Sequence, residues 1–219
     1  MYYKLTDDET QYNFYDIYNI NDNFNNIDKS NIIVLNLSRL NDRLIKLPDL
    51  SEFSNLEYLY CNNILLTELP DLTNCINLIK LECYNNRLTK LPDLSNCINL
   101  ESLDCRLNLL TYLPYLSNCI NIINLICDHN LLVKLPDLSK CINLKVLECS
   151  YNKLIQLPDL SKCTNLMEID CSDNKLNDLP NLTKCINLIS LDYCNNNNIS
   201  LPDLTQCDNL KYLFFLDNK

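Results

Sequence analysis

The sequence predicts a solenoid of stacked repeats in which every repeat contributes one short strand. Leu-Pro recurs at a constant step of 22 residues from Leu47 to Leu201, and these dipeptides contain all eight prolines of the 219-residue chain. Within each step, the spacing of apolar residues changes from three to two, which marks a change of secondary structure. The chain has no glycine. Its turns therefore depend on other residue types, above all asparagine.

Each repeat is predicted to hold an extended segment followed by a strand. With the Leu of Leu-Pro as position 1, apolar residues stand at positions 1, 4, 7, 10, 13, 15 and 20, as in the unit 69–90. Steps of three suit an extended or 3-10 path, whereas Leu81 and Cys83 alternate like a strand with one buried face. Proline at position 2 lacks a donor and belongs outside the strand. One unit cannot bury its own apolar side, so the units must stack.

The repeats divide the chain into a cap segment and an array. Residues 1–31 lie outside the repeat and are rich in Tyr and Phe, and we expect them to cover the first coil rather than to fold independently. The array, 32–219, has a degenerate first unit with one extra residue near Leu40, seven full units and a partial last unit. These units span 32–46, 47–200 and 201–219.

The motif Leu-x-x-Leu-x-Cys-x-x-Asn-x-Leu resembles the leucine-rich repeat, in its 22-residue short-repeat form, over about 32–219. The resemblance implies an α/β-type repeat solenoid, a horseshoe or arc with a parallel sheet on the concave side. It implies 3-10 or extended segments on the convex side, few true α-helices, and binding by the concave face. Composition and opening sequence are also similar to the Asn/Ile-rich repeat proteins of giant DNA viruses, which implies a viral protein.

Asparagine and aspartate columns are predicted to serve the scaffold. Position 18 matches the asparagine ladder of leucine-rich repeats, and its carboxamide offers donors and an acceptor to backbone groups at a sharp turn. Its members are Asn86, Asn108, Asn130, Asn152, Asn174, Asn196 and Asn218, with Ile64 as the departure. Position 9 is asparagine in all eight units and is expected to serve the turn into the strand. Aspartate at position 3, two residues before Ser or Thr, is typical of a cap or Asx turn.

The cysteines are predicted to be reduced and inert. Thirteen of the 14 occupy the inward positions 7 and 15, where a thiol packs like a small hydrophobe. Their spacings of 8 and 14 residues differ from those of zinc sites. Cys194 is the exception, because it stands at the outward position 16 while Tyr193 takes the inward position. A reactive thiol and a local register slip in residues 195–198 are both open explanations.

Composition excludes several classes of function. Phosphate-cradling loops and nucleophile elbows need glycine, and the single histidine, His129, cannot build a classical triad or a His-rich metal site. We therefore expect no catalytic residues, no cofactor and no metal. The net charge of −10 disfavours nucleic acid and anionic membranes as partners. The opening residues lack the features of a signal peptide, which predicts an intracellular protein that is not secreted.

The outward positions 12, 14 and 16 of the strand form the candidate binding face. Position 14 is acidic in five of eight units, and Glu148, Asp170 and Asp192 are predicted to be neighbours in register, which is unfavourable for like charges. Lys80 and Arg106 can offset the earlier acids. Tyrosine anchors with acidic flanks suit a basic protein or peptide. The candidate residues are Tyr58, Tyr60, Glu82, Tyr84, Asp104, Glu148, Glu168, Asp170, Asp192, Tyr212 and Phe214.

Two functions follow from this face and from the last strand. The first is a non-catalytic protein-interaction scaffold, although the acidic residues could also serve only to keep the sheet soluble. The second is a structural or assembly component, in a virion or an oligomer, because residues 212–216 are predicted to form an exposed apolar edge that recruits another strand. End-to-end homodimerisation through 212–216 is one form of that alternative.

Overall fold

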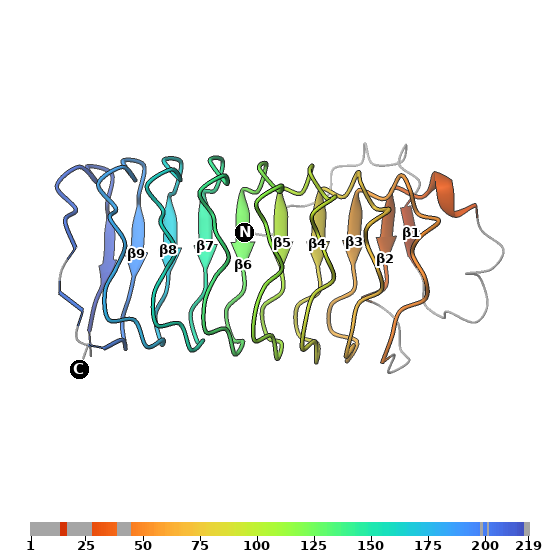
Figure 1. The fold of residues 1–219 in the computed structure, drawn as a ribbon, viewed down its shortest axis with the longest axis horizontal. Coiled ribbons are helices and arrows are strands. Elements are labelled where there is room, and N and C mark those ends of the chain that lie inside the picture. Colours follow the sequence, from red (N-terminus) through yellow and green to blue (C-terminus); the bar gives the residue numbers. More distant parts are fainter. Residues whose placement is uncertain (1–13, 17–27, 39–44, 198, 201, 217–219) are drawn as a thin grey trace.

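The chain forms a stack of coils, and each coil contributes one strand to a single parallel sheet (Figure 1). The computed structural model describes residues 14–16, 28–38, 45–197, 199–200 and 202–216. In this part the sheet has ten strands in chain order. They are β1 (Phe14–Asp16), β2 (Val34–Asn36), β3 (Tyr58–Tyr60), β4 (Lys80–Glu82), β5 (Ser102–Asp104), β6 (Asn124–Ile126), β7 (Val146–Glu148), β8 (Glu168–Asp170), β9 (Ser190–Asp192) and β10 (Tyr212–Phe214).

The segments that connect the strands are extended and turn-rich rather than helical. The described residues contain one short 3-10 helix, η2 (Lys29–Asn31), and no α-helix. Successive turns close between residues three apart, as in Cys75 N–H to Leu72 O and Leu78 N–H to Cys75 O. Such turns place every third side chain on the same side, which explains the apolar steps of three. The predicted fold class is confirmed.

One continuous core runs through the stack. From residue 47 to residue 197 the coils contribute buried leucines or isoleucines from positions 1, 4, 10 and 13 and, as far as Leu176, from position 20. Positions 7 and 15 hold buried cysteines, except for the larger Phe53 and Tyr193. The middle residue of each strand from β3 to β9 is buried and pairs with its counterpart in the next coil, as Leu81 does with Leu103. Because the pairing repeats at every coil, residues at the same position of successive repeats lie next to one another along the stack.

The first coils are less regular than the later ones. Leu35 pairs with Leu59, 24 residues further on, so this coil has two residues more than the 22-residue repeat. The expectation of one extra residue was wrong. Within 1–31, β1 pairs in parallel with β2, so that segment contributes a strand to the sheet. Residues 1–13 and 17–27 lie outside the described residues, and the predicted capping role stays a prediction.

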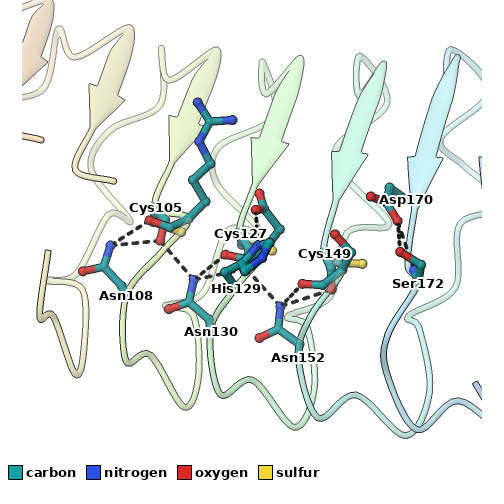
Figure 2. Close-up of polar contacts among 12 residues, drawn as sticks. Cys105, Asn108, Cys127, His129, Asn130, Cys149, Asn152, Asp170 and Ser172 are labelled. Carbon is teal, nitrogen blue, oxygen red and sulfur yellow. Dashed lines mark hydrogen bonds and ion pairs between the residues drawn. The ribbon is translucent and has the colours of Figure 1, made fainter. Parts of the chain in front are cut away.

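Asparagine side chains tie each coil to the one before it. Asn130 Nδ2 donates to Cys105 O at 3.0 Å in the previous coil and to Cys127 O at 3.1 Å in its own, while its Oδ1 accepts from Leu110 N at 3.0 Å. Figure 2 shows Asn108, Asn130 and Asn152 repeating this arrangement in three successive coils. The buried backbone groups of the turn are thereby satisfied. Asn218, the last predicted member, lies outside the described residues.

The other two polar columns bind backbone groups as well. Position-9 asparagines donate to the carbonyl of position 8 in the preceding coil, as Asn121 Nδ2 does to Ile98 O at 3.1 Å. Position-3 aspartates accept from the N–H two residues on, as Asp137 does from Ser139 N at 2.9 Å. This local hydrogen bond lowers the pKa of Asp137. A large share of the asparagine and some of the negative charge is therefore explained by backbone hydrogen bonding.

Candidate protein-binding face

The sheet face, defined as positions 12, 14 and 16 of each coil, carries the candidate residues in straight lines. Strand pairing places the position-14 residues opposite one another along the whole stack. In order they are Tyr60, Glu82, Asp104, Ile126, Glu148, Asp170, Asp192 and Phe214. The regular parallel register therefore brings the predicted acidic side chains into one row.

The part of the sheet face on β3 to β5 neutralises its own charge. Lys80 Nζ lies 2.7 Å from Glu82 Oε1 and 5.6 Å from the ring centre of Tyr60. One coil further on, Arg106 lies 3.4 Å from Asp104 Oδ2, and its guanidinium carbon lies 5.1 Å from the ring centre of Tyr84. Lys80 and Arg106 thus occupy the predicted binding residues of this part through ion pairs and cation–π contacts. These residues are Tyr60, Glu82, Tyr84 and Asp104.

Asp104 offers almost no surface to a partner. It is 6% exposed, and burial, reinforced by the nearby Glu82 and Asp128, raises its pKa to about 6 against the opposing effect of Arg106. Its Oδ1 accepts from the N–H of Arg106 at 3.3 Å. The Asp104 carboxylate is therefore engaged inside the fold.

The part of the sheet face on β7 to β9 keeps its negative charge. Glu148 pairs with Asp170, and Asp170 pairs with Asp192 in the next strand, while Glu168 lies two residues before Asp170. Among the described residues, none of these four carboxylates forms an ion pair. Burial raises the pKa of Glu148, and Asp128 and Asp170 raise it further. We call Glu148, Glu168, Asp170 and Asp192 the acidic row.

Two aspartates of the acidic row also have a local structural role. Asp170 Oδ1 accepts from Ser172 N at 3.0 Å, and Asp192 Oδ1 accepts from Cys194 N at 3.0 Å. These bonds close the strand end, as Asn36 does for Ser38 in β2. These hydrogen bonds explain why a short side chain with an acceptor oxygen stands at position 14 of these coils. They do not require a negative charge, because the neutral Asn36 forms the same hydrogen bond.

The aromatic residues lie at the two ends of the sheet face. Tyr58, Tyr60 and Tyr84 are partly buried on β3 and just after β4, whereas Tyr212 and Phe214 on β10 are 56% and 49% exposed. Phe214 pairs with Asp192, so an exposed ring borders the acidic row directly. Exposed apolar side chains continue to Leu216. Homodimerisation through 212–216 stays a prediction.

Sequence reasoning missed Asp128 and His129 as part of this region. Asp128 Oδ2 lies 2.8 Å from His129 Nδ1, and the His129 ring stacks on Tyr151 with 4.3 Å between ring centres. Asp128 also contributes to the raised pKa values of Asp104 and Glu148. The signal was available, since Asp128 stands at the outward position 16, and the neighbouring coils carry Asp104 and Glu148 at position 14.

The thiols offer little chemistry in this fold. All 14 cysteines lie in the described part, are unpaired, and are buried except for Cys194. Burial raises the pKa of Cys97 to about 12 and that of Cys75 to about 11. Position-7 thiols point at backbone oxygens of the previous coil, as Cys119 Sγ does at 3.5 Å from Leu94 O. Within the described residues, no group of three or more His, Cys, Asp or Glu could hold a metal ion.

Cys194 is partly exposed, and it stands two residues after the regularly paired strand β9. β9 and β10 pair in register, Tyr193 is 1% exposed, and Asn196 occupies its ladder position, so the strand shows no register slip. An offset appears later, because Ile199 is buried one position after the position 20 that is buried in the preceding coils. Burial also raises the pKa of Cys194, with a hydrogen bond to Asp192 contributing, which does not favour a reactive thiolate.

Solved structures with the same architecture are leucine-rich repeat proteins. The leucine-rich effector YopM from Yersinia pestis is 33% identical with a TM-score of 0.73, over 85% of this chain and 49% of its own. The functional domain of InlJ from Listeria monocytogenes, described as including a cysteine ladder, is 26% identical with a TM-score of 0.55, over 87% and 54%. No protein-family model and no curated protein matches the chain.

A plant receptor shows the same fold with a bound partner. The ectodomain of the receptor kinase GASSHO1/SCHENGEN3 from Arabidopsis thaliana, in complex with CASPARIAN STRIP INTEGRITY FACTOR 2, is 25% identical with a TM-score of 0.67, over 84% of this chain and 24% of its own. The chain thus spans about half the length of the two bacterial proteins and about a quarter of the plant one. The predicted leucine-rich repeat fold is confirmed, and the resemblance to viral proteins stays a prediction.

No helix in the described part has the length and apolar character that a bilayer span requires.

Proposed function

We propose that this leucine-rich repeat chain is a non-catalytic scaffold that binds a basic protein or peptide on its sheet face, with the acidic row as the main contact. The single observation that carries the proposal is the contrast between the two parts of that face. Lys80 and Arg106 pair with the acids of β4 and β5, whereas the row from Glu148 to Asp192 has no cation within ion-pair distance among the described residues.

Because the carboxylates of the acidic row form no ion pair among the described residues, a positively charged partner is their best complement. Like charges directly opposite on a sheet are unfavourable, and a partner's Lys or Arg side chains would remove that cost on binding. Phe214 next to Asp192 adds an exposed ring of the kind that anchors interfaces. The complex of the similar plant ectodomain supports protein or peptide binding by this fold. The buried free thiols fit the intracellular location that we propose.

Assembly through the last strand is the second candidate function. Tyr212, Phe214, Phe215 and Leu216 are all exposed beside a sheet edge, and such edges recruit other strands. Sedimentation at increasing concentration distinguishes the two functions. A concentration-dependent dimer that Phe214→Lys abolishes would favour assembly, and a monomer throughout would count against it.

Partner capture by the immobilised protein tests the main proposal. The charge-neutral variant Glu148→Gln/Asp170→Asn/Asp192→Asn keeps every acceptor oxygen of the strand ends and removes three charges. We expect wild type to retain basic proteins from a cell lysate, identified by mass spectrometry, and the charge-neutral variant to lose them. Replacing the same residues by Lys should abolish capture completely.

A matched control separates local charge from net charge. Glu101→Gln, Asp178→Asn and Asp208→Asn together remove three exposed carboxylates outside the sheet face. We expect this control to capture the same proteins as wild type. Equal capture by wild type and the charge-neutral variant would refute the binding role of the acidic row and favour a role in solubility alone.

A further inference from the structure

The turn that follows each strand forces position 17 into a left-handed backbone conformation. In seven successive coils φ at this position lies between 49° and 64°. Among residues with a Cβ atom, Asn, Asp and His are enriched in this conformation, and four coils carry Asn63, Asn85, Asp173 and Asn195 there. The three consecutive central coils carry Leu107, His129 and Tyr151 instead. Leu107 and Tyr151 therefore stand where the backbone disfavours a bulky side chain.

These three side chains form a continuous exposed column. Leu107 N donates to Asp128 O at 3.0 Å and His129 N donates to Ser150 O at 3.0 Å, so backbone hydrogen bonds hold the three turns side by side. Leu107 and Tyr151 are 43% and 52% exposed, and the His129 side chain between them is 46% exposed. Their exposure means that packing in the core does not explain their presence.

A second column widens the apolar surface in the same region. At position 19, two residues on, Leu109 and Leu131 are also exposed. The next coil before them carries Arg87 at this position, and the next coil after them carries Lys153. The apolar surface is thus confined to the centre of the array. We call Leu107, Leu109, His129, Leu131 and Tyr151 the edge strip.

The edge strip lies against carboxylates of the sheet face. Asp128 is the residue before His129 and binds its ring through Oδ2. Glu148 stands three residues before Tyr151 and begins the acidic row. A partner that covers apolar side chains here therefore meets negative charge on the strand side. A second copy of this chain, itself of net charge −10, would bring like charge to the same place.

We propose that the edge strip is a second contact surface, which receives apolar side chains of a segment that also carries Lys or Arg toward Glu148 and the acidic row that begins with it. This inference rests on the proposed function and specifies which residues the partner segment needs. Its basic residues would contact the sheet face, and its apolar residues would cover the turns. Charge alone would not distinguish such a segment from any other polycation. The edge strip supplies that selectivity.

Three labelled peptides of about twelve residues, long enough to cross three coils spaced ~4.8 Å apart, test the pattern. One alternates Lys and Phe, one Lys and Ser, and one Glu and Phe. By fluorescence anisotropy we expect wild type to bind the Lys–Phe peptide roughly tenfold more tightly than either other peptide. Equal binding of the Lys–Phe and Lys–Ser peptides, or no binding of the Lys–Phe peptide, would overturn the inference.

The variant Leu107→Asn/His129→Asn/Tyr151→Asn removes the position-17 column. Because asparagine suits the left-handed conformation, we expect this variant to fold with an unchanged circular dichroism spectrum and to bind the Lys–Phe peptide about tenfold more weakly. Ile98→Thr/Ile120→Thr/Ile142→Thr is the control, since it removes three exposed apolar side chains at position 8, where Thr164 stands in another coil. The control should bind like wild type, and equal loss in both variants would refute a specific role.

Two further outcomes separate this inference from the proposed function. If the charge-neutral variant loses the Lys–Ser peptide while the position-17 variant binds the Lys–Phe peptide like wild type, the acidic row binds and the edge strip does not. A wild-type dimer in sedimentation that the position-17 variant abolishes would show that a second copy covers the edge strip, which also overturns the inference.

Discussion

Glu148 in β7 lies directly opposite Asp170 in β8, and neither carboxylate has an ion-pair partner among the described residues. The equivalent row on β4 and β5 shows the alternative that this sequence uses elsewhere, since Glu82 and Asp104 each bind a cation. The array thus contains acidic residues at position 14 whose charge is paired with a cation, and others at the same position whose charge is not. Comparison of the two within one molecule separates the requirements of the fold from those of a binding surface.

Glu148→Gln should stabilise the folded protein. The substitution removes repulsion with Asp170 and Asp128 and keeps the side-chain length, so we expect the free energy of unfolding to rise by about 0.5 kcal/mol at low salt. The gain should shrink at high salt, because screening weakens the repulsion in wild type. Urea titrations at two salt concentrations measure both effects. Glu101→Gln, on an exposed residue, is the control, and a loss of stability in Glu148→Gln would contradict this account.

Asn130→Ala should be among the most damaging single polar substitutions in the array. Its side chain is buried and binds three carbonyls and the Leu110 N–H, so removal leaves several buried backbone groups unpaired. We expect a loss of about 3 kcal/mol in the free energy of unfolding. Asn118→Ala in the same coil removes one exposed bond, to Ser95 O, and should cost less than about 1 kcal/mol. Similar losses for both variants in chemical denaturation would contradict the ladder's structural importance.

The repeat made it possible to predict which residues are neighbours along the stack, but not which hydrogen bonds their side chains form. A constant 22-residue step turns each sequence position into a spatial row, so the neighbours Glu148, Asp170 and Asp192 followed from spacing alone. The hydrogen bond from Ser172 to Asp170 depends on side-chain orientation at a strand end, which spacing does not determine. The strand β1 escaped prediction because it stands 20 residues before β2, outside the period, and carries none of the repeat's landmarks.

Position 17 shows a different limit of the sequence argument. The lack of glycine led to the expectation that asparagine would take the left-handed turns, and Asn85 and Asn195 do so. The prediction did not identify which position of the unit has positive φ, so Leu107 was not recognised as an exception. Backbone dihedral angles at a turn depend on how the strand joins the next segment, and no side-chain pattern reports them directly.

Asp104→Asn should change how stability depends on pH. The pKa of Asp104 is raised from 3.8 to about 6 by burial, so the folded chain binds this proton more tightly than the unfolded chain does. Folding is therefore most favoured below the unfolded pKa and loses stability as pH rises through about 6. At pH 7 we expect Asp104→Asn to be more stable than wild type by up to about 2 kcal/mol, with the difference disappearing near pH 4. Thermal melts across this range measure it, and an unchanged difference at all pH values would contradict the raised pKa.

Thiol labelling should report on folding rather than on a reactive site. Burial raises the pKa of the inward cysteines, and Cys194 alone is partly exposed. With a disulfide reagent at neutral pH we expect the native protein to react slowly at Cys194 only, and all 14 thiols to react in denaturant. Cys194→Ser should remove the native reaction. Rapid labelling of Cys194, faster than that of a model thiol, would instead identify it as a reactive site.

Leu107→Asn and Asn85→Leu form a reciprocal test of the left-handed turn. Both residues stand at position 17, with φ of 54° and 53°, in neighbouring coils. Because asparagine tolerates this conformation better than leucine, Leu107→Asn should raise the free energy of unfolding by about 0.5 to 1 kcal/mol and Asn85→Leu should lower it by a similar amount. Urea denaturation of the two variants and of wild type measures the pair. If Leu107→Asn were destabilising, contacts of the Leu107 side chain would have to outweigh the backbone cost, and its exposed side chain would be part of the fold rather than a surface kept for a partner.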